Sequence, residues 1–485
     1  MPRALNGSTT LTQTVQTMAS HVLRLTLAAI TGVLIARTLQ PEGRGVYAML
    51  ATTGGIAVVL GNLSIVRSQI ALWRDPARHR ALAGNGLLLG LLLGLVSAAV
   101  TLAVVPVFLP LPALHLLVIA LLAVPFGVAA VNLNGIAQLR SRNGLVNRGV
   151  VASALVLNLP ILVLAATGNL TVTAVIVCWT AAVSAPFWLL LRPLGLRSMR
   201  VEPALARRQL ALSCRYHVGL AAFHLLLTAD VFLLGALVSP AEVGLYTVGA
   251  AFLTFSRVPA DAVTQVALPR QAVEDEHDAR DVSVRVLRLN LLLSSVFVCA
   301  LSIASPVVVP LLYGSAFAGS VTPILLLAPG MVALSLLRPV EQYLVRLGRP
   351  MTMTAVAAVA LAANLALNVL LIPRWGASGA ALAASAAYTA MAAAEITWFA
   401  RRTATGAREL LPRLSDLRSV VSAFSRAGRP AGPRHRPSHP SHPNGPNGPN
   451  GPNGPSGPSG PENFKVSAGK GERAGKTQVS GLDHV

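Results

Sequence analysis

Five ionisable side chains lie inside long apolar stretches of this sequence. His21 and Arg24 are three residues apart near the start of the chain, Arg257 and Asp261 are four apart, and Asp230 stands alone. Because an ionisable group inside a membrane is costly to bury, such groups usually serve a function. Each of the five is therefore a candidate site residue.

Arg24 carries the chemistry best suited to an anionic ligand. A guanidinium can bind a diphosphate through two parallel hydrogen bonds. Arg24 also shares a helix face with His21, since residues three apart lie side by side. The alternative is that Arg24 extends toward the membrane surface, where its charge meets water. The residues alone leave both interpretations open.

Arg257 and Asp261 have the spacing of an ion pair within one helix, with Pro259 between them. We expect an internal pair beside a proline kink. The alternative places Arg257 on a sugar diphosphate and leaves Asp261 to neutralise it when the cavity is empty.

Asp230 lies near the middle of its apolar stretch. A carboxylate at that depth can bind Na⁺ or a proton in a transporter, or it can pair with an arginine of another helix. Asn364 and Asn368 share a helix face and are expected to pack against other helices. Glu395 lies near the end of the last apolar stretch and is expected to reach water.

The sequence lacks the residue patterns for metal binding, ATP hydrolysis and a disulfide scaffold. The histidines have no cysteine or carboxylate spacing that would form a metal site. No phosphate-binding loop of the Walker type occurs, so we expect no ATP hydrolysis. The three cysteines are scattered and odd in number, which excludes a disulfide scaffold. We predict no cofactor and no metal.

The composition indicates what must position these side chains. Of 485 residues, 53% are apolar and 12% charged, with a mean hydropathy of +0.62, whereas soluble domains have about 25% charged residues. This excludes a cytosolic enzyme and indicates a polytopic membrane protein. Runs long enough to cross a bilayer predict about twelve helices, at 15–38, 46–66, 83–105, 113–137, 150–167, 172–191, 217–238, 244–266, 287–312, 322–340, 353–373 and 377–399.

The positive charge of +21 is distributed as a topology signal. Arginines fill alternate gaps between spans, and no lysine precedes Lys465. Since cytoplasmic loops carry the positive excess, both termini are predicted to be cytoplasmic. Arg44 and Arg374 are exceptions in outer gaps. This pattern argues against nucleic-acid binding, and the short outer loops argue against a membrane glycosyltransferase or polymerase, so no enzyme activity is expected.

The sequence contains an internal repeat at an offset of 199 residues. Proline stops a helix, glycine permits a tight turn, and tyrosine can anchor at the membrane interface. The offset spans six helices, so both halves keep the same orientation. We therefore predict an all-α fold of two six-helix bundles, 1–200 and 201–402, related by a parallel pseudo-twofold axis. The repeated hairpin residues are Pro41, Gly45 and Tyr47, and Pro240, Gly244 and Tyr246.

The remainder of the chain has a different composition. Residues 403–424 are predicted to form either a short amphipathic segment on the inner surface or a solvated basic tail. Residues 425–485 are rich in Pro and Gly, which favours a disordered linker. Such a tail can tether a protein to a partner.

Four segments resemble the polysaccharide-export branch of the multidrug/oligosaccharidyl-lipid/polysaccharide exporter superfamily. They occur in the family's order, and residues 364–383 match best. The resemblance covers roughly residues 10–400. Gln40, where the family usually has glycine, and the long tail are departures. The segments are 36–47, 230–235 with 243–246, 311–317, and 364–383.

The resemblance implies a flippase of the cell envelope. It implies alternating access around a central cavity, and transfer of a lipid-linked oligosaccharide, usually on undecaprenyl diphosphate, across a bacterial plasma membrane. Flippases of this superfamily have cationic cavities with an arginine on the first helix, which favours Arg24 as a substrate contact. Expected partners are this substrate, membrane lipids and glycan-synthesis proteins that bind the tail. The alternative is a Na⁺- or H⁺-coupled multidrug or metabolite exporter of the same fold. The related lipid II flippases usually carry two further helices, which the predicted spans lack.

Overall fold

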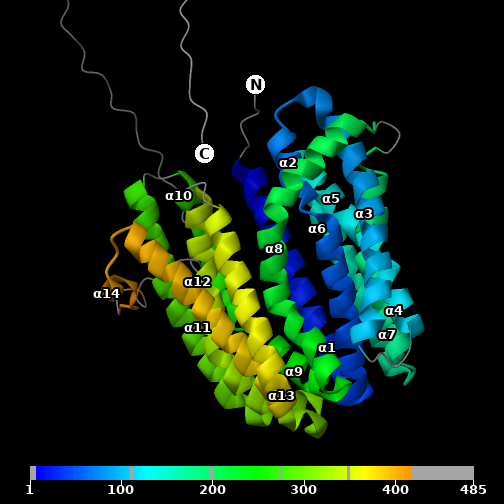
Figure 1. Cartoon of the computed structure of the whole chain (residues 1–485), viewed down its shortest axis with the longest axis vertical. Coiled ribbons are helices and arrows are strands. Elements are labelled where there is room, and N and C mark those ends of the chain that lie inside the picture. The colour runs from blue at the N-terminus through cyan, green and yellow to red at the C-terminus, as the bar shows by residue number, and fades with distance from the viewer. Residues whose placement is uncertain are drawn as a thin grey trace, which may run out of the picture. The chain divides into compact units, whose positions relative to one another are not determined.

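The computed structural model describes residues 7–109, 114–195, 200–273, 276–346, 350–413 and 416 (Figure 1). In these ranges every regular element is a helix. The predicted linker 425–485 lies outside them. The helices are α1 (Gly7–Asn62), α2 (Ile65–Leu72), α3 (His79–Phe108), α4 (Leu114–Leu121), α5 (Ala123–Leu139), α6 (Asn143–Ala166), α7 (Val172–Leu191), α8 (Pro203–Leu237), α9 (Pro240–Thr254), α10 (Arg257–Val273), α11 (Glu276–Tyr313), α12 (Val321–Arg346), α13 (Pro350–Arg402) and α14 (Ala407–Leu410).

The described helices accommodate the predicted number of membrane crossings. Nine stretches are long and apolar enough to cross a membrane. Two of them, Val22–Leu72 and Met353–Arg402, are 51 and 50 residues long and bend in the middle, so each holds two crossings. The broken pair α9 and α10 adds another. The all-α fold with about twelve crossings is confirmed.

The two sequence halves form two helical groups that meet along α1, α8 and α9 (Figure 1). In the first half α3 packs on α5 and α6 packs on α7. In the second half α13 packs on both α12 and α8. One apolar core includes side chains from both halves, such as Met49 and Leu50 with Leu234 and Val243. The exact boundary between the halves, predicted at residue 200, stays a prediction.

The repeated hairpins contact each other reciprocally. A Cβ atom placed on Gly45 would collide with the carbonyl of Pro240, and one placed on Gly244 would collide with the carbonyl of Pro41. The second contact is the first with each residue replaced by its repeat-related equivalent, since Gly45 corresponds to Gly244 and Pro41 corresponds to Pro240. Glycine is required at both positions because only a bare Cα lets the two backbones approach so closely. We call the end that holds residues 40–45 and 239–244 the hairpin end.

Two sharp bends complete the hairpin end. Gln40 divides α1 with φ 57° and ψ 178°, a region that favours glycine. Gly376 divides α13 with φ 53°. The Glu242 carboxylate accepts a hydrogen bond of 2.7 Å from the backbone N–H of Ala377, so it caps the helix that follows the second bend.

Arg37 also joins the halves at the hairpin end. Its Nε donates to the carbonyl of Leu312 at 2.7 Å, and Nη2 donates to the carbonyl of Leu311 at 2.5 Å. Arg37 belongs to α1, and both acceptors are among the last residues of α11. A cation therefore satisfies the carbonyl end of a helix from the opposite half.

Helix α8 begins against the first half and continues into the second (Figure 1). Near its start, Leu205 packs in a cluster with Leu72 and Leu82, and the His217 ring is 3.2 Å from the hydroxyl of Ser64. The helix starts at Pro203, well before the span predicted at 217–238. Its added turns connect the halves at the end opposite the hairpins.

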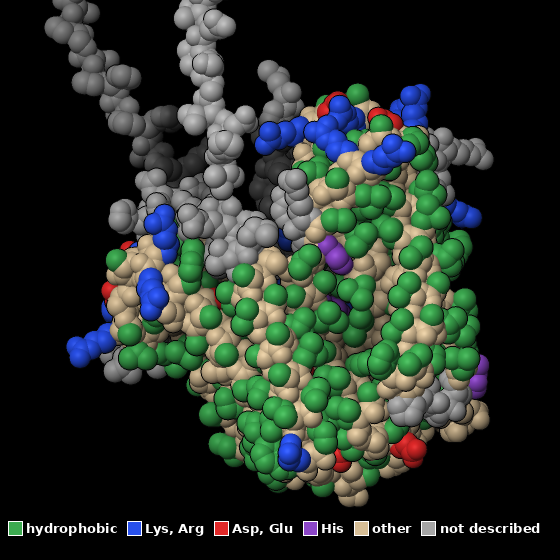
Figure 2. Space-filling view, viewed as in Figure 1, with side chains coloured by type: hydrophobic (Ala, Val, Ile, Leu, Met, Phe, Trp, Pro, Cys, Tyr) green, Lys and Arg blue, Asp and Glu red, His purple; other side chains and the backbone are tan. Residues whose placement is uncertain are grey.

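That opposite end carries most of the positive charge. The gaps after α2, α5 and α7 hold the arginine groups that the sequence pattern singled out. In the face shown in Figure 2, most visible Lys and Arg side chains gather there. We call it the arginine end.

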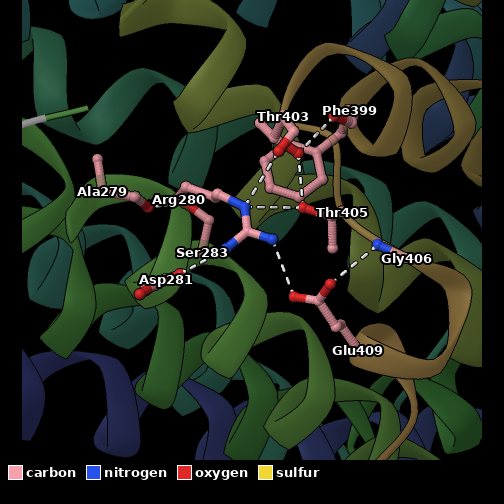
Figure 3. A network of polar contacts seen from close by, with 9 residues as sticks. All are labelled: Ala279, Arg280, Asp281, Ser283, Phe399, Thr403, Thr405, Gly406 and Glu409. Atoms are coloured by element: carbon pink, nitrogen blue, oxygen red, sulfur yellow. Dashed lines mark hydrogen bonds and ion pairs between the residues drawn. The ribbon is translucent and has the colours of Figure 1, made fainter. Parts of the chain in front are cut away.

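A network of polar contacts ties the chain after α13 to α11 at the arginine end (Figure 3). Arg280 donates to the carbonyl of Thr403 at 3.2 Å and to the hydroxyl of Thr405 at 3.1 Å. It also binds the carboxylates of Asp281 and Glu409, each at 2.8 Å. We call these five residues the clasp.

The clasp positions a segment for which the sequence predicts an amphipathic helix or a solvated tail. In the described part of 403–424 the structure contains the four-residue helix α14. Its last residue, Leu410, packs against the apolar cluster that contains Tyr343 and Phe399. Arg288 of α11 lies 3.6 Å from Asp416, and both are mostly buried. The rest of 403–424 lies outside the described residues, so the prediction of an amphipathic segment stays a prediction.

Candidate functional site

Asp230 is the centre of a buried polar cluster in the second half. Its carboxylate, on α8, is fully buried. Tyr246 of α9 donates its hydroxyl hydrogen to one oxygen at 2.8 Å. Asn368 of α13 donates its amide to the other at 2.8 Å and to the Asn364 side-chain oxygen at 3.0 Å. Three helices thus surround one carboxyl group with neutral donors.

The neighbours of Asp230 bear on the alternatives that the sequence left open. Its hydrogen-bond partners are a phenol and an amide, and no arginine partner is found among the described residues. The Asn368 side-chain oxygen is buried without a hydrogen-bond donor. A carboxylate with adjacent amide oxygens suits a hard cation or a proton. The described residues contain no cluster of three or more His, Cys, Asp or Glu that could hold a metal ion.

The sequence suggested that Tyr246 anchors the hairpin at the membrane interface, but the structure buries this side chain inside the protein. It is 4% exposed and bound to Asp230. The repeat-related Tyr47 is partly buried, and the guanidinium of Arg44 lies 5.3 Å from its ring centroid. Both rings therefore face protein, because the two hairpins pack against each other instead of against lipid headgroups. Arg44, an exception to the charge pattern, is explained by this cation–π contact.

Asp261 pairs with Arg338 of α12 at 3.4 Å, and not with Arg257. Arg257 is the first residue of α10, directly after the break from α9. Its Nε is buried without a hydrogen-bond acceptor, and its charge acts on Glu341 of α12. The expected internal pair is wrong because packing of α10 on α12 supplies a second arginine to Asp261.

Arg24 is exposed on α1. It lies sixteen positions before the bend at Gln40, about 24 Å along the axis, so it belongs to the half of α1 nearer the arginine end. The backbone of His21 is helical, but its side chain lies outside the described residues. Arg24 is thus an exposed side chain, and the structure does not bring it into the Asp230 cluster.

Sequence reasoning missed the connections at the hairpin end. Arg37 and Glu242 both bind backbone groups more than 130 residues away along the chain. A proline followed closely by glycine, as at Pro373 and Gly376, indicates a bend in a helix. The helix that starts after the bend has free backbone N–H groups, which need a hydrogen-bond acceptor. Nothing in the sequence pairs that acceptor with Glu242.

Three comparisons place the chain among known proteins. A family model described as "Polysaccharide biosynthesis protein" matches residues 11–272. No curated protein matches the chain significantly.

Solved transporter structures share the fold. The lipid II flippase MurJ in an inward closed conformation has a TM-score of 0.63 at 12% identity, covering 87% of this chain and 94% of MurJ. An inward-facing multidrug resistance transporter of the MATE family has a TM-score of 0.61 at 12% identity, covering 79% and 94%. A transporter from Pyrococcus furiosus with a binding pocket of reversed polarity has a TM-score of 0.58 at 14% identity, covering 80% and 94%. The superfamily fold predicted from the sequence is confirmed.

Proposed function

The chain belongs to the polysaccharide biosynthesis protein family, and from that premise we propose that it flips a lipid-linked oligosaccharide. The substrate, on undecaprenyl diphosphate, moves from the cytoplasmic to the outer leaflet of a bacterial plasma membrane by alternating access. The chain acts as a transporter and has no enzyme activity of its own. Both termini are cytoplasmic, which puts the arginine end inside and the hairpin end outside.

Arg24 is the observation that carries this proposal. It is an exposed cation on a membrane-crossing helix. A charge in that setting is stable where water or an anion can reach it. Arg257 adds a guanidinium nitrogen that is buried without an acceptor. Both can bind a diphosphate, whose oxygens match the guanidinium geometry.

Asp230 is the proposed coupling site. Binding of a proton or Na⁺ there neutralises the only charge in a cluster of neutral donors, and it changes the hydrogen bonds that join α8, α9 and α13. Such a change alters the packing of the second half. The membrane potential adds a driving force, because an inside-negative potential favours outward movement of anions by about 2.3 kcal/mol per charge per 100 mV.

The second candidate function is a Na⁺- or H⁺-coupled exporter of drugs or metabolites. Asp230 and Asp261 favour it, since carboxylates attract cationic drugs. Asp261 is already paired with Arg338, however, and Asp230 is buried among its own donors. The exposed charge is cationic, which favours an anionic substrate. The tail is proposed to tether glycan-synthesis proteins.

A flipping assay in liposomes tests the proposal. Fluorescent undecaprenyl-diphosphate sugars would be supplied to the native chain and to Arg24→Ala, Arg257→Ala and Arg374→Ala. Charge-assisted hydrogen bonds contribute about 1.5–3 kcal/mol, so the first two variants should flip at least about tenfold more slowly. Arg374, exposed at the hairpin end, bonds within its own helix and serves as the control.

Absence of flipping by well-folded native protein across several sugars and ion gradients contradicts the proposal. Uptake of a cationic drug under an imposed Na⁺ or proton gradient, under the same conditions, supports the exporter.

A further inference from the structure

Glu395 is a buried carboxyl group that has no hydrogen-bond partner among the residues that the structure describes. It lies on α13, two turns before the end of the helix, and is 1% exposed. Both of its carboxylate oxygens are inaccessible to water and neither receives a hydrogen bond. This contradicts the expectation that Glu395 reaches water. Asp230, in contrast, receives a hydrogen bond on each oxygen.

Glu395 is buried because α12 packs along α13. Near the end of α13, Val340 and Tyr343 of α12 share an apolar cluster with Phe399, and the Tyr343 and Phe399 ring centroids are 5.0 Å apart. Helix α11 begins at Glu276, before the predicted residue 287, and its Ala279 belongs to the same cluster. The end of α13 is therefore covered by protein.

The nearest charge makes an ionised Glu395 less favourable still. Glu341 of α12 acts on it electrostatically and carries the same sign. Arg257 and Arg338 act on Glu341, and Arg338 also binds Asp261. The two arginines thus compensate Glu341 and Asp261, and no cation among the described residues acts on Glu395. The described charged and titratable side chains on the surrounding helices include Arg338, Glu341 and Tyr343 of α12, Arg257 and Asp261 of α10, Arg280, Asp281, Arg285 and Arg288 of α11, and His217, His224 and Asp230 of α8.

Removing an ionised carboxylate from water into such surroundings costs too much free energy, so a carboxyl group in this position binds a proton instead. From this geometry we propose that Glu395 is a proton-binding site inside the second half, separate from Asp230. The proton adds to one carboxylate oxygen of Glu395 and leaves from the same oxygen. Ionisation of Glu395 requires water or a cation to enter between α12 and α13, so it is linked to movement of these helices.

Glu395 shares its helix with a buried polar group that interacts with the Asp230 cluster. Tyr388 lies on α13 seven residues before Glu395, is buried, and donates its hydroxyl hydrogen to the carbonyl of Leu226 at 3.4 Å. Asp230 and Arg257 both act on it electrostatically. The role of Glu395 in transport rests on the proposed function, since a proton bound there changes the charge along a path that ends at the proposed coupling site.

The first test measures protonation directly and does not depend on transport. Infrared spectra of the full chain in lipid nanodiscs would be compared between native protein and Glu395→Gln, which preserves shape. The native protein should show the carbonyl stretch of a protonated carboxyl group at neutral pH, and the variant should lack it. Glu341→Gln should keep the band but change the pH at which it disappears. Glu42→Gln, an exposed residue at the hairpin end, should leave the spectrum unchanged.

The second test uses the flipping assay at several pH values. Glu395→Gln should flatten the pH dependence of the rate, while Glu42→Gln should retain it. A native band whose intensity is unchanged in Glu395→Gln overturns the proton site whether or not the chain flips lipid. If the band is lost in the variant but native protein does not flip any substrate, the proton site stands and the proposed function fails. If native protein flips lipid and Glu395→Gln keeps the native pH profile, Glu395 has no role in transport.

Discussion

The guanidinium of Arg37 in the first half donates a 2.7 Å hydrogen bond to the carbonyl of Leu312 in the second half. Leu312 is the penultimate residue of α11, and its carbonyl has no acceptor role within its own helix. The bond therefore exists only while the hairpin end is closed.

Arg37→Ala is expected to favour opening of the hairpin end. Loss of these bonds removes about 1 kcal/mol, which shifts a two-state population about fivefold. Spin labels at Glu42→Cys and Ser315→Cys, both exposed, would report the distance between the halves in a chain without other exposed cysteines. Arg374→Ala is the matched control, since Arg374 bonds to Leu370 of its own helix. Equal distance distributions in the two variants would rule out the interpretation.

Gly45→Ala should destabilise the closed hairpin end. The added methyl group would overlap the Pro240 carbonyl, and overpacking of this kind costs about 1–3 kcal/mol. Gly55→Ala is the control, because a Cβ at Gly55 has no atom within 4 Å. Thermal unfolding in detergent should show a lower midpoint for Gly45→Ala alone. A midpoint no lower than that of Gly55→Ala would mean that the hairpins readily separate.

Gln40→Gly should stabilise the protein. Gln40 has φ 57° and ψ 178°, a conformation that costs a non-glycine residue about 1–3 kcal/mol. The variant loses the bond from the Gln40 side chain to the Arg37 carbonyl, so a net gain of about 1 kcal/mol is expected. Gly376→Ala is the converse test, because it replaces a glycine at φ 53° with a residue that has a side chain. The added Cβ atom would lie 2.5 Å from the Glu242 carboxylate, so this variant should lower the thermal midpoint. A lower midpoint for Gln40→Gly would show that its side-chain bond outweighs the strain.

Acid should open the clasp. The backbone N–H of Gly406, and then the Arg280 guanidinium, lower the pKa of Glu409 below its usual value. A depressed pKa means that Glu409 stabilises the clasp above its unfolded pKa, and that this contribution is lost as the pH falls through the folded pKa. Protonation removes the charge that Arg280 binds at 2.8 Å.

Hydrogen exchange of the amides in 406–410 would test this, with native protein and Glu409→Gln compared at the same pH so that intrinsic exchange rates cancel. The variant should exchange faster at neutral pH, and the difference should disappear in acid. A difference that persists at low pH contradicts the assigned role of Glu409.

The repeat and the spans could be predicted because they depend on local residue types. Pro41 and Pro240 mark the backbone breaks at the two hairpins, and apolar runs define crossings. The partners of Asp230 could not be predicted, since Asn368 is 138 residues away and the rotation of each helix about its axis decides which side chains meet. The same holds for Asp261, whose partner is on α12. The burial of Glu395 could not be predicted either, because it depends on how α12 packs along α13.

The reciprocal contact of Gly45 with Pro240 and Gly244 with Pro41 has the form of an isologous interface, in which one surface patch binds a second copy of itself. The single chain thus has the arrangement of a homodimer whose two protomers are joined covalently through the start of α8. The polar side chains depart from that symmetry, because Asp230 and Glu395 belong to the second half and Arg24 belongs to the first. Covalent fusion lets the two halves carry different polar groups while the hairpin contact between them is kept.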